Sequence, residues 1–164
     1  MGKLLEKVVT HLIYRDLNNY ALVPTNQYGG RVSSSTLDAG LALLHDIQSA
    51  HKAGLEAGLL FGIHGSFDNI DRDRLIQIVR KLGFASEIVD WCRSFIPDRT
   101  GRLRFNGGTS DAFELAIGTP QGSPVSPVLS IIYTAPLLYK IRTWSNASLG
   151  MYIDDGAIFA CGKN

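Results

Sequence analysis

The 164-residue chain has the length of a single compact domain, and its 45% hydrophobic and 19% charged residues exclude a solvated, disordered protein. The formal net charge of +1 does not by itself indicate a partner. Two cysteines without paired spacing indicate a reducing environment. With no secretory leader or membrane-length apolar run visible, we expect an intracellular protein of the nucleus or cytoplasm that is neither secreted nor membrane-inserted.

Helices are predicted for the first third of the chain. Apolar residues recur at helical spacing from Leu4 to Ile13, so the chain is expected to open in an amphipathic helix. After a polar, glycine-containing stretch at 24–31, Ser35 can cap a second helix that ends near Gly54. The expected apolar stripe of this second helix consists of Leu37, Leu41, Leu44 and Ile47.

The middle third predicts one strand and two helices. Residues 59–63 are a short apolar run followed by turn residues, which is typical of a buried strand. Asp71 is expected to cap a third helix, and Gly83 stands where that helix would stop in the left-handed conformation. Ser86 is expected to start a fourth helix.

The last third predicts two hairpins around a helix. Asn106-Gly107, flanked by alternating apolar residues, is a strong signal for a β-ribbon. The Pro- and Gly-rich stretch 118–127 leads into a helix that runs toward Trp144. Residues 149–153 and 157–160 are short apolar strands separated by Asp154-Asp155-Gly156, which predicts a hairpin with acids at its tip. The elements together indicate one α+β unit.

Adjacent carboxylates at Asp154 and Asp155 are the most informative chemical feature. Two charges between apolar strands are costly unless a cation compensates them, and Mg²⁺ prefers oxygen ligands. A pair of such ions can stabilise the attacking and leaving oxygens of a phosphoryl displacement. An exposed Asp-Asp-Gly turn explains the same residues, so the tetrapeptide from Tyr152 to Asp155 is by itself an even choice between the two interpretations.

The second feature is the loop from Gly118 to Pro127, in which rigid prolines and permissive glycines lead into a helix. Such a loop can approach another backbone closely and presents one amide side chain, that of Gln121. A simple connection is the alternative. The length of the loop and its position ahead of an acidic hairpin favour a functional role.

Together these features resemble the reverse transcriptase family. Residues 152–155 are similar to its metal-binding Tyr-x-Asp-Asp motif, and Pro120-Gln121-Gly122 is similar to its Pro-Gln-Gly motif. Residues 27–36 look like a fingers segment and residues 67–72 like the end of the first palm motif. The order is most similar to non-long-terminal-repeat retrotransposon enzymes, with intron-encoded enzymes second.

The resemblance implies a palm-like antiparallel sheet packed on helices, at about 58–164, with a partial helical fingers region at about 1–57 and no thumb. It implies an RNA-directed DNA polymerase, a nucleotidyltransferase that acts on an RNA or DNA primer-template and a deoxynucleoside triphosphate. Mg²⁺, or Mn²⁺ in its place, would be held by Asp154 with Asp155 beside it. The last strand is expected to form an exposed palm edge along which a partner chain could pair.

Further roles follow from the same resemblance. Phe67 is similar to the bulky residue that stands under the incoming sugar and screens against a 2′-hydroxyl. Gln121 and Gly122 would lie along the nascent base pair and the primer-template, and Arg31 would meet the template or the incoming phosphates.

Gly62 departs from the family pattern. The first palm motif of the family begins with an aspartate five positions before the aromatic residue, and counting back from Phe67 reaches Gly62. Glycine has no side chain to bridge two ions, so metal is expected to bind weakly if at all, and the chain is predicted to be impaired or inactive. Asp68 and His64 are poor substitutes, by position and by ligand type. The alternatives are a catalytically dead palm that binds nucleic acid or protein, and a retrotransposon remnant that folds only partly.

Overall fold

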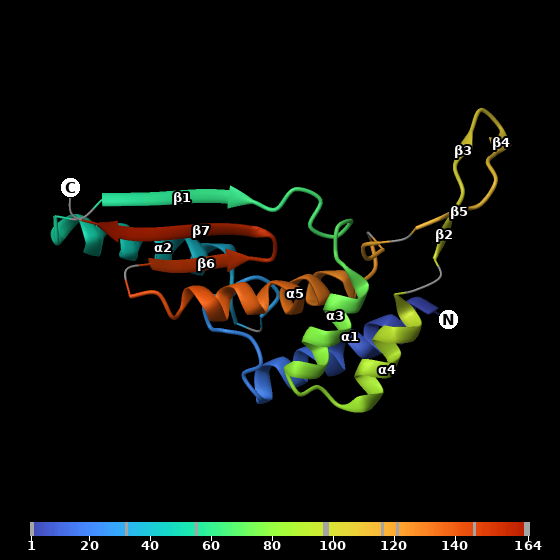
Figure 1. Ribbon diagram of the computed structural model, residues 1–164, viewed down its shortest axis with the longest axis horizontal. Coiled ribbons are helices and arrows are strands. Elements are labelled where there is room, and N and C mark those ends of the chain that lie inside the picture. The colour runs from blue at the N-terminus through green and yellow to red at the C-terminus, as the bar shows by residue number, and fades with distance from the viewer. Residues whose placement is uncertain are drawn as a thin grey trace.

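The computed structural model describes residues 2–31, 33–54, 56–96, 99–115, 117–120, 122–145 and 147–162. The chain combines helices and antiparallel strands without a regular βαβ repeat, so the predicted α+β class is confirmed (Figure 1). The helices are α1 (Gly2–Asn19), α2 (Thr36–Lys52), α3 (Arg72–Lys81), α4 (Ser86–Phe95) and α5 (Ser126–Ile141). The strands are β1 (Glu56–Gly62), β2 (Thr100–Gly101), β3 (Arg104–Phe105), β4 (Gly108–Thr109), β5 (Phe113–Glu114), β6 (Ala147–Tyr152) and β7 (Asp155–Gly162).

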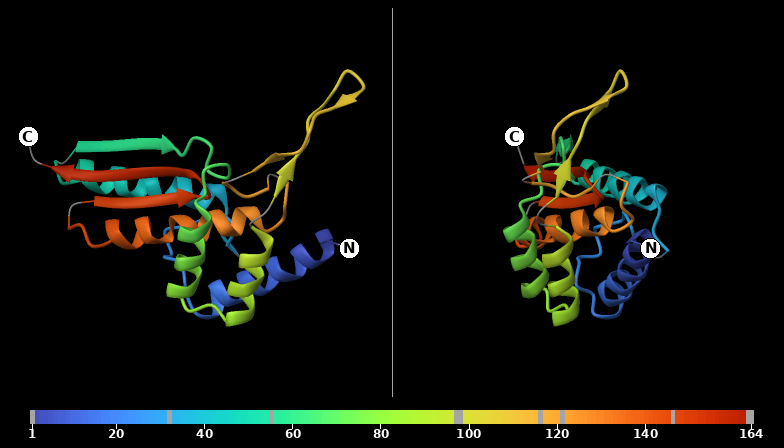
Figure 2. Two further views of the ribbon diagram at one scale, coloured as in Figure 1. Left: turned by 45° about the vertical axis from the view of Figure 1, so that its right-hand side comes forward. Right: turned by 90° about the vertical axis from the view of Figure 1, so that its right-hand side faces the viewer.

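The main sheet is antiparallel and has the strand order β1-β7-β6. Side chains alternate across β6: Leu149 and Met151 pack with Leu138 of α5, whereas Ser148 donates a hydrogen bond to Asp46 of α2 at 2.9 Å. The sheet therefore lies between α5 on one face and α2 on the other, as Figures 1 and 2 also show.

The expectation that the last strand forms the exposed edge is wrong. β7 is the central strand, because β6 pairs with one side of it through the hairpin and β1 pairs with the other. The outer side of β6 is also occupied, since the Tyr28 amide donates to the Met151 carbonyl at 2.7 Å and the Met151 amide donates to the Asn26 carbonyl at 2.9 Å. Among the described residues, the outer side of β1 is the edge without a paired strand.

The helical layer contains the largest core cluster, in which α1, α3, α4 and α5 meet. Asp71 caps α3 as predicted, with its carboxylate accepting from the Arg74 amide at 2.7 Å, and Gly83 follows that helix at φ +86°. Ser86 is the first residue of α4, but the N-cap position belongs to Ala85 and has no side-chain cap. Cys92 is buried in this cluster, and burial raises the pKa of its thiol to about 12.

The predicted apolar stripe of α2 does not face the core. Ser35 caps this helix with a reciprocal bond to Asp38, as predicted, but the four stripe residues are between 44% and 69% exposed. The residues of α2 that line the cleft between this helix and the sheet are Thr36, Ala39, Gly40, Ala42, Leu43 and Asp46, most of which are small. This face of α2 borders an open cleft, and the buried residue of the helix is Ala50, so apolar periodicity alone does not predict how α2 is placed.

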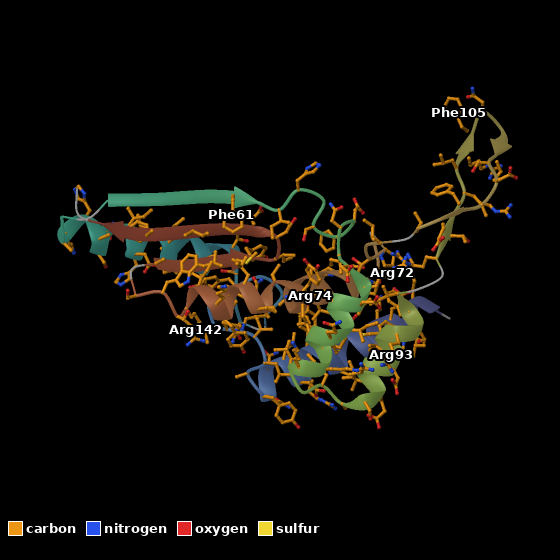
Figure 3. The ribbon with its side chains drawn as sticks, viewed as in Figure 1. Phe61, Arg72, Arg74, Arg93, Phe105 and Arg142 are labelled. Atoms are coloured by element: carbon orange, nitrogen blue, oxygen red, sulfur yellow. The ribbon has the colours of Figure 1, made fainter. Side chains whose placement is uncertain are left out.

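The β-ribbon is confirmed. Asn106 and Gly107 have φ values of +47° and +78°, which fit the tight turn between β3 and β4, and β2 pairs with β5 further down the same ribbon. The ribbon projects away from the rest of the chain (Figures 1 and 2). Phe105 is 78% exposed near its far end (Figure 3).

Candidate active site

The acidic hairpin joins β6 to β7. The two strands pair from Ala147 with Ala160 to Tyr152 with Asp155, so Ile153 and Asp154 form the two-residue turn. The hairpin was predicted, but its tip was placed too late, because Asp155 and Gly156 belong to β7. Asp154 is half-buried at the tip and Asp155 is exposed at the start of its strand.

Gly62 lies beside these aspartates at the end of β1. It is the direct pairing partner of Asp155, and the Ile63 amide donates to the Asp154 carbonyl at 3.2 Å. Directly opposed residues of an antiparallel pair point to the same face, so Tyr152, residue 62 and Asp155 share the face toward α2. A Cβ atom added at Gly62 would lie 3.3 Å from Oδ1 of Asp155.

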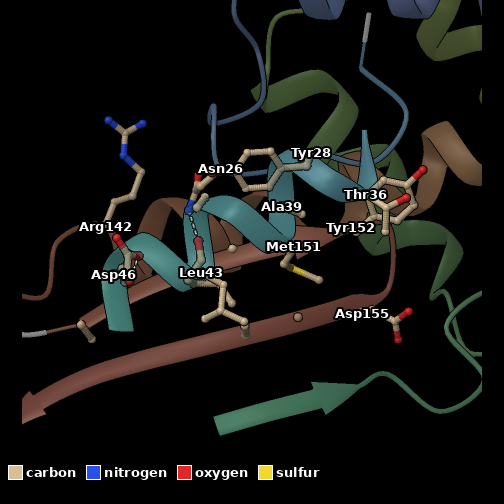
Figure 4. A pocket seen from close by; sticks show the side chains of 18 residues that line it. Asn26, Tyr28, Thr36, Ala39, Leu43, Asp46, Arg142, Met151, Tyr152 and Asp155 are labelled. Atoms are coloured by element: carbon tan, nitrogen blue, oxygen red, sulfur yellow. Dashed lines mark hydrogen bonds between the residues drawn. The ribbon is translucent and has the colours of Figure 1, made fainter. Parts of the chain in front are cut away.

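A cleft between α2 and the sheet opens beside Asp155. It has a volume of about 480 Å³, and Tyr28, Asp46 and Tyr152 are among the residues that line it (Figure 4). Burial, followed by the nearby carboxylates of Asp46 and Asp38, raises the pKa of the Tyr28 phenol, so this group stays protonated. The walls of the cleft are mainly small or apolar residues, and Asp155 and Asp46 contribute carboxylates.

The residues present fit a divalent cation only in part. Among the described residues, no group of three or more His, Cys, Asp or Glu side chains is arranged to hold a metal ion. Mg²⁺ can bind through one or two carboxylates when water and substrate phosphates complete its coordination shell. Asp154 and Asp155 would be the two carboxylates. A second ion would need the further carboxylate that Gly62 lacks.

A second cleft, of about 720 Å³, brings together Phe67 and Gly122. Lys3 and Lys7 of α1 also line it, so two positively charged side chains border the cleft. The other lining residues are Ser123, Pro124, Ser126 and Pro127. The structure therefore places two of the predicted binding residues in one basic cleft.

Hydrogen bonds fix the walls of this second cleft. The Thr119 amide donates to the Phe67 carbonyl at 2.7 Å, which holds the start of the Pro- and Gly-rich loop against the segment after β1. The Ser123 hydroxyl donates to the Glu6 carboxylate at 2.6 Å, which ties the loop to α1. The sequence had no signal for Glu6, Lys3 or Lys7, because their contacts with the loop exist only in the folded chain.

Two of the described residues predicted for the site, Asp154 and Arg31, line neither cleft. Arg31 donates to the Pro24 carbonyl at 3.2 Å, a contact within its own loop, and it lines neither cleft. Gln121 lies outside the described residues.

A family profile described as reverse transcriptase (RNA-dependent DNA polymerase) matches residues 1–164. The chain belongs to the reverse transcriptase family. Over 163 residues, this reverse transcriptase chain is 26% identical to the probable RNA-directed DNA polymerase from transposon BS of Drosophila melanogaster, covering 96% of the chain and 18% of the relative. It is 22% identical over 173 residues to the RNA-directed DNA polymerase from mobile element jockey of the same species, covering 100% of the chain and again 18% of the relative. The chain thus spans about a fifth of the length of these relatives. Both relatives are polymerases of mobile elements, which confirms the expected retrotransposon type.

Solved structures with a similar fold include telomerases. Apo telomerase from Candida tropicalis, truncated from its C-terminal domain, superposes with a TM-score of 0.65 at 16% identity, over 96% of this reverse transcriptase chain and 34% of the telomerase chain. Telomerase from Candida albicans gives a TM-score of 0.56 at 12% identity, over 98% and 30% of the two chains. Within the part of the chain that is described, no helix has the length and apolarity needed to cross a membrane.

Proposed function

We propose that this chain is the palm, at about 58–164, and part of the fingers, at about 1–57, of an RNA-directed DNA polymerase whose metal site is incomplete. The observation that carries the proposal is the pairing of Gly62 with Asp155, because a side chain at position 62 would adjoin the Asp155 carboxylate. A carboxylate there would complete a three-aspartate cluster with the hairpin. Glycine leaves that cluster with two members.

The reaction of such a polymerase is a phosphoryl transfer. The primer 3′-oxygen forms a bond to the α-phosphorus of the incoming nucleotide, the bond from that phosphorus to pyrophosphate breaks, and the hydroxyl proton leaves to solvent. Bound Mg²⁺ would supply Lewis-acid stabilisation of the charge on the phosphate oxygens. Asp154 and Asp155 would hold the ion at the end of the hairpin.

The basic cleft is proposed to receive the nucleotide and the template strand. The Phe67 ring would pack against the sugar, and the ammonium groups of Lys3 and Lys7 would attract phosphates. Gly122, whose φ is +81°, would let the loop backbone approach a base pair closely. Gln121 beside it, and Arg31 at the template, are assigned by resemblance to the family.

Primer extension tests the proposal. The unmodified chain, Gly62→Asp and Gly62→Asn are given an RNA template, a DNA primer, deoxynucleotides and Mg²⁺. Synthesis by Gly62→Asp alone is the expected result, since Asn matches Asp in size but lacks the charge that binds the ion. Synthesis by the unmodified chain at the rate of Gly62→Asp would show that residue 62 contributes no ligand.

A catalytically inactive nucleic-acid-binding module is the second candidate, because the basic cleft contains neither Gly62 nor either aspartate of the hairpin. Retention of a primer-template should then fall as salt rises, since phosphate contacts release counterions. The double change Lys3→Ala and Lys7→Ala should weaken retention and flatten the salt dependence. A variant of two lysines elsewhere, Lys52→Ala with Lys140→Ala, is the matched control. If both double variants weaken retention equally, the cleft is not the binding surface.

A further inference from the structure

Gln27 makes an unusual set of contacts with the acidic hairpin. Its side chain is fully buried, and its Oε1 atom accepts hydrogen bonds from the amides of Ile153 and Gly29, both at 3.1 Å. Its Nε2 atom donates to the Ile153 carbonyl at 3.4 Å. One buried amide therefore contacts both polar ends of the residue that precedes Asp154.

Ile153 has a backbone conformation that isoleucine rarely adopts. Its φ is +60°, and it is the first of the two turn residues of the hairpin. A positive φ at this place suits the twist of a tight hairpin, and glycine usually provides it. A β-branched residue persists there only when the surrounding structure fixes it. The hydrogen bonds from and to Gln27 are interactions of that kind.

The segment around Gln27 is itself anchored to the sheet. Tyr28 and Asn26 bond to Met151 on the outer side of β6, and the Asn26 side chain donates to the Leu149 carbonyl. Gly29 allows the close approach, because a Cβ atom added there would lie 2.5 Å from the Ile153 nitrogen. Gln27 is thus held at a fixed position relative to the turn by contacts other than its own.

We propose that Gln27 is a positioning residue that holds Ile153 in its left-handed conformation and so fixes where Asp154 and Asp155 present their carboxylates. The hydrogen bonds themselves do not depend on the function of the hairpin. That this positioning serves metal binding rests on the proposed function. The two parts can therefore fail separately.

Amide hydrogen exchange of the unmodified chain, followed by NMR, is the first test and needs no variant. The Ile153 amide should exchange at least about tenfold more slowly than in an unstructured peptide, because a hydrogen bond that contributes about 1.4 kcal/mol slows opening tenfold. The Cα chemical shift of Ile153 should have a value that indicates a positive φ. Exchange of this amide at the unstructured rate would overturn the proposal.

Variants then test the cause. Gln27→Leu keeps the volume but removes the polar atoms, and it should accelerate exchange of the Ile153 amide about tenfold while most of the β6–β7 ladder stays protected. Thr134→Val is the control: it removes a different buried polar group, a hydroxyl that donates within α5, and should leave Ile153 unchanged. If Gln27→Leu does not fold, Gly29→Ala provides the second route, because its added Cβ would displace the Ile153 nitrogen without removing Gln27. Unchanged Ile153 exchange in Gln27→Leu, or in a folded Gly29→Ala, would overturn the proposal.

Ile153→Gly provides the decisive comparison. Glycine adopts a positive φ freely, so in this background Gln27→Leu should shift the Asp154 and Asp155 resonances far less than it does with Ile153 present. Additive effects of the two changes would show that Gln27 does not act through the conformation of Ile153.

The link to metal is tested separately, by Mn²⁺-induced broadening of the Asp154 and Asp155 amide resonances in Gly62→Asp with and without Gln27→Leu. Equal broadening in both would refute the functional part alone, and no broadening in Gly62→Asp would refute the proposed function while leaving the positioning role intact.

Discussion

Gly62→Asp should make the stability of the chain depend on divalent cations. The added Cβ would lie 3.3 Å from Oδ1 of Asp155, so the two carboxylates would be near neighbours on one face of the sheet. Two unit charges about 4 Å apart repel by about 1 kcal/mol in water and by about 4 kcal/mol at the effective dielectric constant of a protein surface. Because Asp155 is exposed, we expect a cost near the lower figure, about 1 kcal/mol.

A cation that binds both carboxylates reverses this effect. Ligand binding to the folded state stabilises it by RT ln(1 + [L]/Kd), about 2.7 kcal/mol when the ion is present at about 100 times its Kd. Thermal unfolding of Gly62→Asp should therefore occur below that of Gly62→Asn in EDTA and above it in millimolar Mg²⁺ or Mn²⁺. The unmodified chain and Gly62→Asn should respond little to either ion. Equal melting temperatures of Gly62→Asp in EDTA and in excess Mn²⁺ would refute the reasoning.

Three further predictions concern local structure. Asp71→Ala should destabilise the chain by about 1 kcal/mol in chemical denaturation because α3 loses its N-cap, whereas Asp71→Ser should not; equal losses would contradict the capping role. The Ser35 hydrogen bonds lower the pKa of Asp38, so the stability that this pair contributes is present at neutral pH and is lost as the pH falls through the lowered pKa. Ser35→Ala should therefore flatten that part of the acid unfolding profile. An unchanged profile would contradict the role of these hydrogen bonds. Gly118→Ala should cost more stability than Gly83→Ala, although both glycines have a positive φ. A Cβ atom at Gly118 would lie 2.5 Å from the backbone of Asp68, whereas one at Gly83 would meet nothing within 4 Å. Equal unfolding midpoints of the two variants would contradict this reasoning.

The features predicted correctly from the sequence are those that local chemistry decides. Asp71 caps a helix, Gly83 ends it and Asn106-Gly107 forms a hairpin turn because each residue type suits a particular backbone conformation within a few residues. The orientation of α2 was not predictable in this way. Its apolar stripe is regular, yet the face toward the sheet is a different one that includes Leu43 and several small residues, and that choice depends on β6 and β7, about a hundred residues further along the chain.

The same distinction applies to the candidate site, part of which could be predicted from local sequence and part of which could not. Asp154, Asp155 and Gly62 could be selected as candidates from the sequence, because the acidic hairpin and the spacing between Gly62 and Phe67 could be compared with motifs of the family. The placement of β7 between β1 and β6 could not be read, because the last strand has no sequence signal that distinguishes a central position from an edge. The role of Gln27 could not be predicted from the sequence either, because its hydrogen bond with Ile153 joins residues 126 positions apart and forms only in the folded chain.

Two supports hold the acidic hairpin, and only one of them involves the strand that carries residue 62. β1 pairs with β7 through backbone bonds that glycine makes as well as aspartate would, and the Ile63 amide still bonds to the Asp154 carbonyl. On the other side, Gln27 bonds to Ile153 without any contribution from β1. On the proposed function, glycine at position 62 would therefore lack a metal ligand while leaving the backbone that would present it in place. It follows that Gly62→Asp should require only a small shift of the Asp155 side chain, and that adding this one carboxylate should produce cation binding at a hairpin that is already positioned.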